Sequence, residues 1–168
     1  MNRLLSAVLA AAAFTTLGVG AADARNRARV DQWGYANGAA ASQNGDRNSA
    51  VVVQRGANHY ARGVQDGYNN FLRMDQYGTR NHVSTMQGGR DNFAVTGQDG
   101  RNLRADTIQT GRGNTSGIAQ IGTNHRAQAD QDGVNNTSGI IQVGNGQEVS
   151  VRQRGDNNIS VVVQSGYE

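Results

Sequence analysis

The chain of 168 residues contains no cysteine and no proline, and arginine carries all its basic charge because lysine is absent. The absence of cysteine excludes a disulfide framework and thiolate-bound metal. With 23 glycines and only 36% hydrophobic residues, the composition is otherwise typical of disordered segments. Disordered linkers normally carry proline, whereas a continuous hydrogen-bonded sheet excludes it, so its absence favours β-structure.

Strong charge of one sign is also lacking. Sixteen basic residues face 13 acidic ones, for a net charge of +3, and aspartates interrupt the arginines in every region. We therefore interpret the arginines as a solvated face and expect no nucleic-acid partner. No nucleophile–base pair or carboxylate pair recurs, so we expect no enzyme, no small-molecule substrate and no cofactor.

The first 24 residues differ from the rest. Arg3 precedes an apolar run over 4–20, and Ala22-Asp23-Ala24 fits a small-x-small cleavage site. This pattern predicts a secretory signal peptide over 1–24 and a mature chain over 25–168. The alternative is an uncleaved membrane anchor, for which the apolar run is barely long enough.

An eleven-residue repeat fills the mature chain. Glutamine recurs at every eleventh position, and glycine follows each glutamine by two positions. The thirteen glutamines are Gln32, Gln43, Gln54, Gln65, Gln76, Gln87, Gln98, Gln109, Gln120, Gln131, Gln142, Gln153 and Gln164. The thirteen glycines are Gly34, Gly45, Gly56, Gly67, Gly78, Gly89, Gly100, Gly111, Gly122, Gly133, Gly144, Gly155 and Gly166. Such self-similarity indicates a repeat architecture.

Three further positions of the unit are restricted. Counting glutamine as position 0, position +7 is mostly alanine or serine and position +9 is mostly valine, threonine or isoleucine. Position +5 is asparagine in nine of thirteen units, the exceptions being His59, Leu103, His125 and Gln147. The nine are Asn26, Asn37, Asn48, Asn70, Asn81, Asn92, Asn114, Asn136 and Asn158.

Alternation at these positions predicts strands. A helical eleven-residue repeat would place thirteen glycines inside helices, at about 1 kcal/mol each. Positions 0, +5, +7 and +9 share one face of a strand and never hold a charged residue, so that face is buried and the other is wet. Each unit then reads as a seven-residue strand and a four-residue turn containing the glycine.

Two units close one rung of 22 residues, because one unit has only one turn. The fold predicted is an all-β solenoid of about six and a half rungs, stacked at ~4.7 Å. Residues 22 apart become neighbours, so the glutamines form two internal amide ladders and the asparagines line the interior with them. Three rungs separate His59 from His125, so they substitute for asparagine and bind no metal. On the outside, Phe71 should stack on Phe93, and Arg55 should lie between Trp33 and Tyr77.

These motifs resemble the curlin repeat, as in Asn48-Ser-Ala-Val-Val-Val-Gln54 after Gln43-Asn-Gly45. The resemblance covers residues 26–166. It implies a secreted subunit of curli, the amyloid fibres of bacterial surfaces, with roles in biofilm matrix and adhesion. It also implies other curlin subunits and an outer-membrane secretion pore as partners. The family's major subunit usually has a Gly/Asn-rich leader, whereas Asn26 here is in repeat register two residues after the predicted cleavage.

The two ends of the predicted stack differ. The N-terminal strand over 25–32 carries charged residues on its outer face, whereas the C-terminal strand over 158–164 is uncharged and β-branched. A soluble solenoid should end in an atypical polar unit, so Val161, Val162 and Val163 indicate a polymerising edge. The sequence therefore predicts a self-assembling fibre subunit, with a nucleator subunit or a soluble binding solenoid as alternatives.

Overall fold

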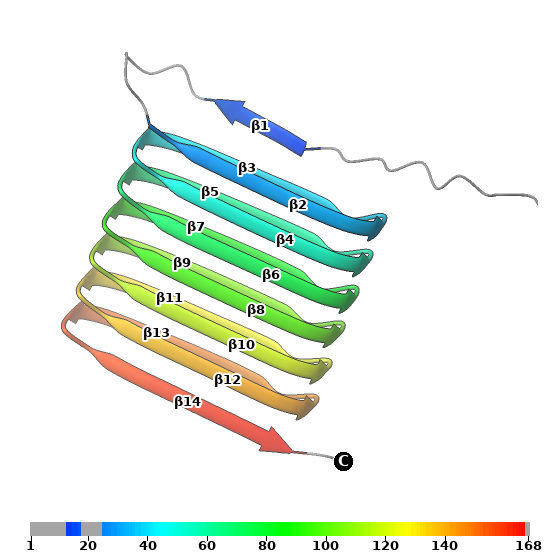
Figure 1. Ribbon diagram of the computed structural model, residues 1–168. Helices are drawn as coiled ribbons and strands as arrows, with labels where there is room; N and C mark the ends of the chain where they lie inside the picture. Colours follow the sequence, from blue (N-terminus) through cyan, green and yellow to red (C-terminus); the bar gives the residue numbers. More distant parts are fainter. Residues whose placement is uncertain (1–12, 18–24, 167–168) are drawn as a thin grey trace, which may run out of the picture.

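The computed structural model describes residues 13–17 and 25–166, and the part described is entirely β (Figure 1). Its strands form two parallel seven-stranded sheets, with the orders β1-β3-β5-β7-β9-β11-β13 and β14-β12-β10-β8-β6-β4-β2. Consecutive strands therefore alternate between the sheets, and the chain winds as a β-solenoid. This confirms the predicted fold class.

The strands of the solenoid are nine residues long, except the last, which has eight. They are β2 (Arg27–Tyr35), β3 (Gly38–Asp46), β4 (Ser49–Ala57), β5 (Tyr60–Tyr68), β6 (Phe71–Thr79), β7 (His82–Arg90), β8 (Phe93–Arg101), β9 (Arg104–Arg112), β10 (Thr115–Thr123), β11 (Arg126–Val134), β12 (Thr137–Asn145), β13 (Glu148–Asp156) and β14 (Ile159–Gly166).

Strand pairing confirms the 22-residue rung. In every solenoid pair the partners are 22 residues apart, as in Gln32 with Gln54. The outer face follows the same rule: the rings of Phe71 and Phe93 stack with centroids 4.9 Å apart and an interplanar angle of 13°. The guanidinium of Arg55 lies 4.7 Å from the ring centroid of Trp33 and 5.6 Å from that of Tyr77. Both predicted stacks are therefore confirmed.

The predicted division into a seven-residue strand and a four-residue turn is wrong. Each strand from β2 to β13 begins one residue after position +5 and runs three residues past the glutamine, so the glycine at +2 lies within the strand. The tight corner falls instead at position +4, where residues such as Asn58 and Arg80 both have φ of 58°. Left-handed φ at this position reverses the chain within two residues, which leaves room for longer strands.

The apolar core is a thin layer of small side chains from positions +7 and +9. Its members are Ala39, Ala41, Ala50, Val52, Ala61, Leu72, Met74, Val83, Ala94, Ala105, Ile118, Ala127, Ala129, Ile140, Val149 and Val151. Gly63 shows how closely the two sheets approach, since a Cβ there would lie 3.0 Å from Leu72 and 3.2 Å from Met74. The absence of a side chain at Gly63 thus makes room for the large side chains of Leu72 and Met74.

One strand was not predicted. β1 (Ala13–Leu17) pairs with β3, and its register of Ala13 with Ala39 departs from the 22-residue rule. It falls within the segment predicted as a signal peptide, whose other residues, 1–12 and 18–24, lie outside the part described. β1 lies along the N-terminal edge of β3 (Figure 1).

Candidate functional site: internal ladders and open ends

The thirteen glutamines form two hydrogen-bonded columns inside the solenoid, one per sheet. Except in Gln153 and Gln164, which end the two columns, the Nε2 of each glutamine donates to the Oε1 of the glutamine 22 residues later, at 2.6–3.2 Å in one column and 2.7–2.9 Å in the other. The structure therefore places all thirteen predicted residues in two continuous ladders. Each bond links one rung to the next.

A second bond from the same amide joins the two sheets. The Nε2 of each glutamine from Gln43 to Gln153 also donates to a backbone carbonyl 16 residues earlier, at 2.9–3.1 Å. That carbonyl belongs to the first residue of the preceding strand, in the facing sheet, as Gln98 shows with His82. Both N–H groups of the amide are used, so shortening or replacing the side chain breaks contacts in two directions.

The asparagines at +5 bond mainly to backbone rather than to one another. The Oδ1 of Asn48 accepts the backbone N–H of Asn70 at 3.0 Å, and its Nδ2 donates to the carbonyls of Asn44 and Gly67 at 3.0 and 2.9 Å. Direct amide-to-amide bonds occur only toward the C-terminal end of this column, between Asn114, Asn136 and Asn158. The asparagine thus satisfies the polar groups exposed by the corner, as a capping residue does.

His59 and His125 take over this role. The Nδ1 of His59 accepts the backbone N–H of Asn81 at 3.3 Å, and its Nε2 lies 3.2 Å from the carbonyl of Arg55. His125 makes the equivalent contacts with Gln147 and Ile121. An accepting Nδ1 and a donating Nε2 require the neutral imidazole. Burial accordingly lowers the pKa of His59, against backbone hydrogen bonds that raise it.

Glycine at +2 is imposed by stacking. At Gly78, φ is +100° and a Cβ would overlap the carbonyl oxygen of Gly100 in the next rung. The same clash with the following rung recurs along both corners up to Gly144. The predicted turn glycines are therefore brought into two columns of their own, within the strands rather than in the loops.

At the C-terminal end of the described residues, β14 is the terminal strand of its sheet. On β14, Ile159, Val161 and Val163 are 78%, 65% and 64% exposed, and Val162 packs partly buried against the core. A Cβ at Gly166 would meet only the Nε2 of Gln147, at 3.6 Å. Nothing within the described chain therefore requires glycine there, whereas a following rung would.

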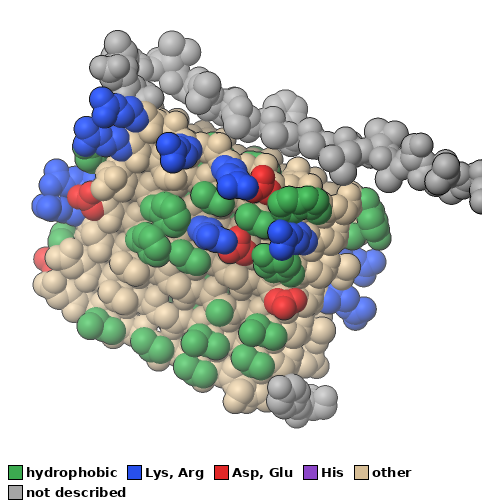
Figure 2. Space-filling view, viewed as in Figure 1, with side chains coloured by type: hydrophobic (Ala, Val, Ile, Leu, Met, Phe, Trp, Pro, Cys, Tyr) green, Lys and Arg blue, Asp and Glu red, His purple; other side chains and the backbone are tan. Residues whose placement is uncertain are grey.

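The outer face of the even-numbered sheet changes character along the stack. Its strands β2 to β8 carry charged residues on the outside, whereas β10, β12 and β14 carry none. Exposed apolar side chains follow instead, including Ile121 at 52% and Ile141 at 42% exposed. Figure 2 shows blue and red groups over the N-terminal rungs and only green ones over the last. The sequence prediction of a uniformly wet outer face missed this patch.

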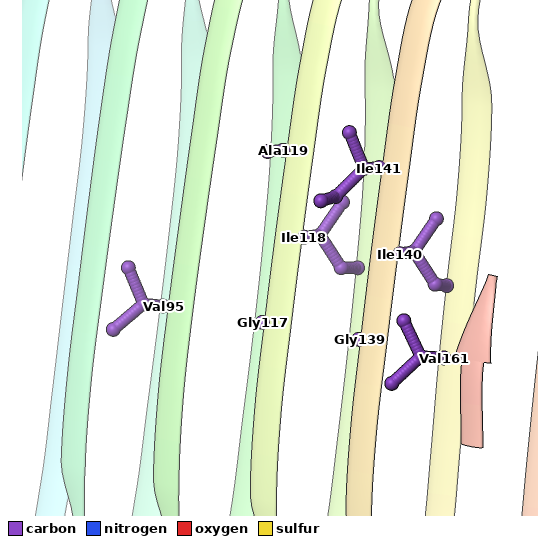
Figure 3. Close-up of a pocket in the computed structure, with 8 residues that line it drawn as sticks. All are labelled: Val95, Gly117, Ile118, Ala119, Gly139, Ile140, Ile141 and Val161. Atoms are coloured by element: carbon purple, nitrogen blue, oxygen red, sulfur yellow. The ribbon is translucent and has the colours of Figure 1, made fainter. Parts of the chain in front are cut away.

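A shallow apolar groove lies within that patch (Figure 3). Gly117 and Gly139 leave space between the side chains of Val95, Ile141 and Val161. Its lining offers no charged group and no nucleophile, so the groove suits apolar packing rather than chemistry.

Groups for metal binding are not assembled within the described residues: no cluster of three or more histidine, cysteine or acidic side chains occurs there. The same part of the chain holds no helix long and apolar enough to cross a membrane. His82 lies on the outside against Tyr60, with ring centroids 5.0 Å apart. Burial, and to a smaller extent the positive charge of Arg104, lower the pKa of His82, whereas the negative charge of Asp106 raises it.

A two-sheet parallel solenoid, held together by side-chain amide ladders, defines a structural repeat protein. Comparison with protein families identifies which one: the model of the curlin associated repeat matches residues 45–78 and 100–133. Both matched segments begin and end on a glycine at position +2. Over these two segments the chain therefore carries curlin-associated repeats. Comparison with curated proteins and with solved structures gives no significant match.

Proposed function

We propose that the mature chain, residues 25–168, is exported and self-assembles outside the cell into curli-like amyloid fibres. The observation that carries this proposal is the uncapped end of the stack at β14. Its outer apolar residues are exposed, and the Gln142–Gln164 bond of 3.2 Å ends a ladder that a further glutamine would extend. Open strand edges of this kind recruit further strands.

Energetics favour assembly over a solitary monomer. The interior consists largely of glutamine, asparagine, alanine and serine, so little apolar area is buried. Ordering the backbone costs ~1–2 kcal/mol per residue. Stacking copies end to end covers two open ends of the solenoid at each junction and lengthens every ladder. We therefore expect folding and assembly to occur together.

The test is seeded assembly of the purified mature chain. Thioflavin-T fluorescence should rise after a lag that preformed fibres abolish, and fibre diffraction should show the ~4.7 Å spacing of stacked strands. A cooperatively folded chain that stays monomeric in dilute buffer would refute the proposal and favour a soluble binding solenoid, for which the apolar groove offers a surface.

The biological roles belong to the same proposal. In the family, such fibres serve biofilm matrix and surface adhesion, and export passes through an outer-membrane pore. A minor nucleating subunit is the second candidate. The complete C-terminal repeat, with its in-register pairing of Gln142 with Gln164, favours a fibre-forming subunit. Fibres that form on cells only when a second curlin is present would favour the nucleator.

A further inference from the structure

Within the described residues, the solenoid contains an odd number of strands. Leaving aside β1, one sheet has the six strands β3 to β13 and the other has the seven strands β2 to β14. The last rung is therefore half complete: β14 has no partner strand after β13 in the opposite sheet. How a second copy stacks on this end is a geometric question with two distinct answers.

In direct stacking, the next copy keeps the same orientation. Its β2 then pairs with β14, but its β3 lies two strand spacings from β13, and a strand is missing from that sheet at every junction. A vacancy of this size exposes two strand edges to water inside the fibre. It also places Arg27, Arg29 and Asp31 of the next copy opposite Ile159, Val161 and Val163.

Half-turn stacking removes the vacancy. If the next copy is rotated by about 180° around the fibre axis, its β2 continues the sheet of β13 and its β3 continues the sheet of β14. Strand directions still match, because strands of the two sheets run oppositely within a rung. We infer that the fibre assembles in this way, each subunit turned by half a turn; this inference rests on the proposed function.

Side chains along the junction support the half turn. Residues at the same repeat position become neighbours, so most charged residues of β13 and of the next β2 meet an opposite charge or a ring, whereas Arg29 meets Ser150. These contacts repeat pairs already made within the chain: Arg126 with Glu148 at 3.8 Å, Arg152 with Asp130 at 3.3 Å and Arg55 over Trp33 at 4.7 Å. The pairs created are Glu148 with Arg27, Arg152 with Asp31, and Arg154 with Trp33 of the next copy. The apolar side chains of β14 meet Gly38, Ala40 and Ser42.

An unsatisfied acceptor lies at the same junction. The Oε1 of Gln147 is buried and accepts no hydrogen bond from the residues described. Gln147 ends the corner column in which His125 already accepts its backbone N–H at 3.2 Å. After a half turn, the next member of that column is Asn26 of the next copy, and its backbone N–H would donate to this oxygen as the N–H of Asn70 does to the Oδ1 of Asn48. Direct stacking would leave Gln147 facing the vacancy.

The two arrangements differ in their helical parameters. Thirteen strands shared between two sheets give a rise of six and a half strand spacings, or about 31 Å, with a twist near 180°. Direct stacking gives seven spacings, or about 33 Å, with a twist near zero. β1 lies on the β3 edge, so the junction requires a chain without residues 1–24. Apart from β1 with β3, every strand pair lies within β2 to β14, so the chain from Arg25 retains the whole solenoid.

Cysteine crosslinking separates the arrangements, since the chain has no cysteine of its own. Val161→Cys is combined either with Ala40→Cys, its neighbour after a half turn, or with Arg29→Cys, its neighbour in direct stacking. Within one chain each pair is more than ~20 Å apart at strand spacing, so a disulfide must join two copies. Fibres of both variants are oxidised, dissolved in denaturant and run on a non-reducing gel.

The half turn predicts a ladder of covalent multimers for the Val161→Cys and Ala40→Cys pair, and none for the pair with Arg29→Cys. The inference would be overturned by ladders from the pair with Arg29→Cys only, or by ladders from neither pair. Dimers from a variant with Val161→Cys as its single cysteine would also overturn it. Absence of fibres from every chain, including the unmodified one, would instead refute the proposed function. Cryo-electron microscopy of unmodified fibres gives the rise and twist without any substitution; a twist near zero overturns the half turn.

Charge exchange adds a second test. Glu148→Arg places two arginines together at the junction and should slow seeded elongation by about two- to five-fold, as exposed pairs do. Arg27→Glu should act likewise, and the double variant should recover the original rate. Loss of the Arg126 contact alone would not be rescued by a change at residue 27. Failure of rescue, with fibres otherwise intact, counts against the half turn.

Discussion

Replacing Gln98 by leucine is the most direct test of the internal ladders. Gln98 lies in the middle of its column and is 1% exposed. Its Nε2 donates to Gln120 at 2.8 Å and to the carbonyl of His82 at 3.1 Å, and its Oε1 accepts from Gln76 at 3.0 Å. Leucine has a similar volume but no polar atom, so three hydrogen bonds disappear without a large cavity.

The cost follows from the groups left behind. The amides of Gln76 and Gln120 each lose a partner in a site that water does not reach. An unsatisfied buried group costs about 1–3 kcal/mol, so the two together should cost about 3 kcal/mol or more. If folding is coupled to assembly, this difference appears in the critical concentration for fibre growth, which should rise more than about 100-fold.

Seeded growth at a series of concentrations measures that value. Arg101→Ala is the matched control, because Arg101 is exposed at the end of the same strand, β8, and makes no side-chain hydrogen bond or ion pair among the residues described. Gln98→Glu keeps the shape but cannot donate when ionised, and its defect should lessen as the pH falls, because protonation removes the buried charge and restores one donor. Equal critical concentrations for Gln98→Leu and Arg101→Ala would refute the inward placement of the ladder.

Three further predictions concern other parts of the fold. Gly78→Ala should prevent assembly, because its Cβ overlaps the next rung, whereas Gly88→Ala, with nothing within 4 Å, should be tolerated in a sedimentation assay. Fibre resistance to denaturant should fall as the pH drops below about 6.5. Because burial lowers the pKa of His59, the unfolded chain binds a proton there that the folded chain does not. The variant His59→Asn should therefore show a weaker dependence on pH. Ile141→Arg, on the exposed apolar patch, should reduce lateral bundling seen by electron microscopy without changing seeded elongation.

Much of the fold follows from the spacing of a few residue types. The glutamine period sets the rung, and the absence of charge at four positions of the unit separates inside from outside. Phe71 and Phe93 could be paired in advance because only the 22-residue rung makes them neighbours. Side-chain ladders are predictable in this way, since identical residues must occupy identical places in every rung.

The corner could not be placed with the same certainty. Glycine at +2 suggested the turn, yet the residue that reverses the chain is at +4, where Asn58 and Arg80 both adopt left-handed φ. Arginine is a poor indicator of that conformation, and only the frequent asparagine at +4 carries the signal. Glycine at +2 is needed for a different reason, the close approach of the next rung, which only the stacked structure reveals.

The distribution of charge on the outer face can be predicted only when odd and even repeat units are considered separately. The eleven-residue period by itself does not separate them. In one sheet, charged residues persist to Arg152 and Arg154 on β13, whereas in the other none follows Arg101, the last residue of β8. Each subunit therefore has one apolar side near its C-terminal end. Direct stacking would align these patches along one side of a fibre, so fibres would associate in pairs. Half-turn stacking places them alternately on opposite sides, about 31 Å apart, so each fibre can bind neighbours on both sides and bundles can grow without a limit set by symmetry.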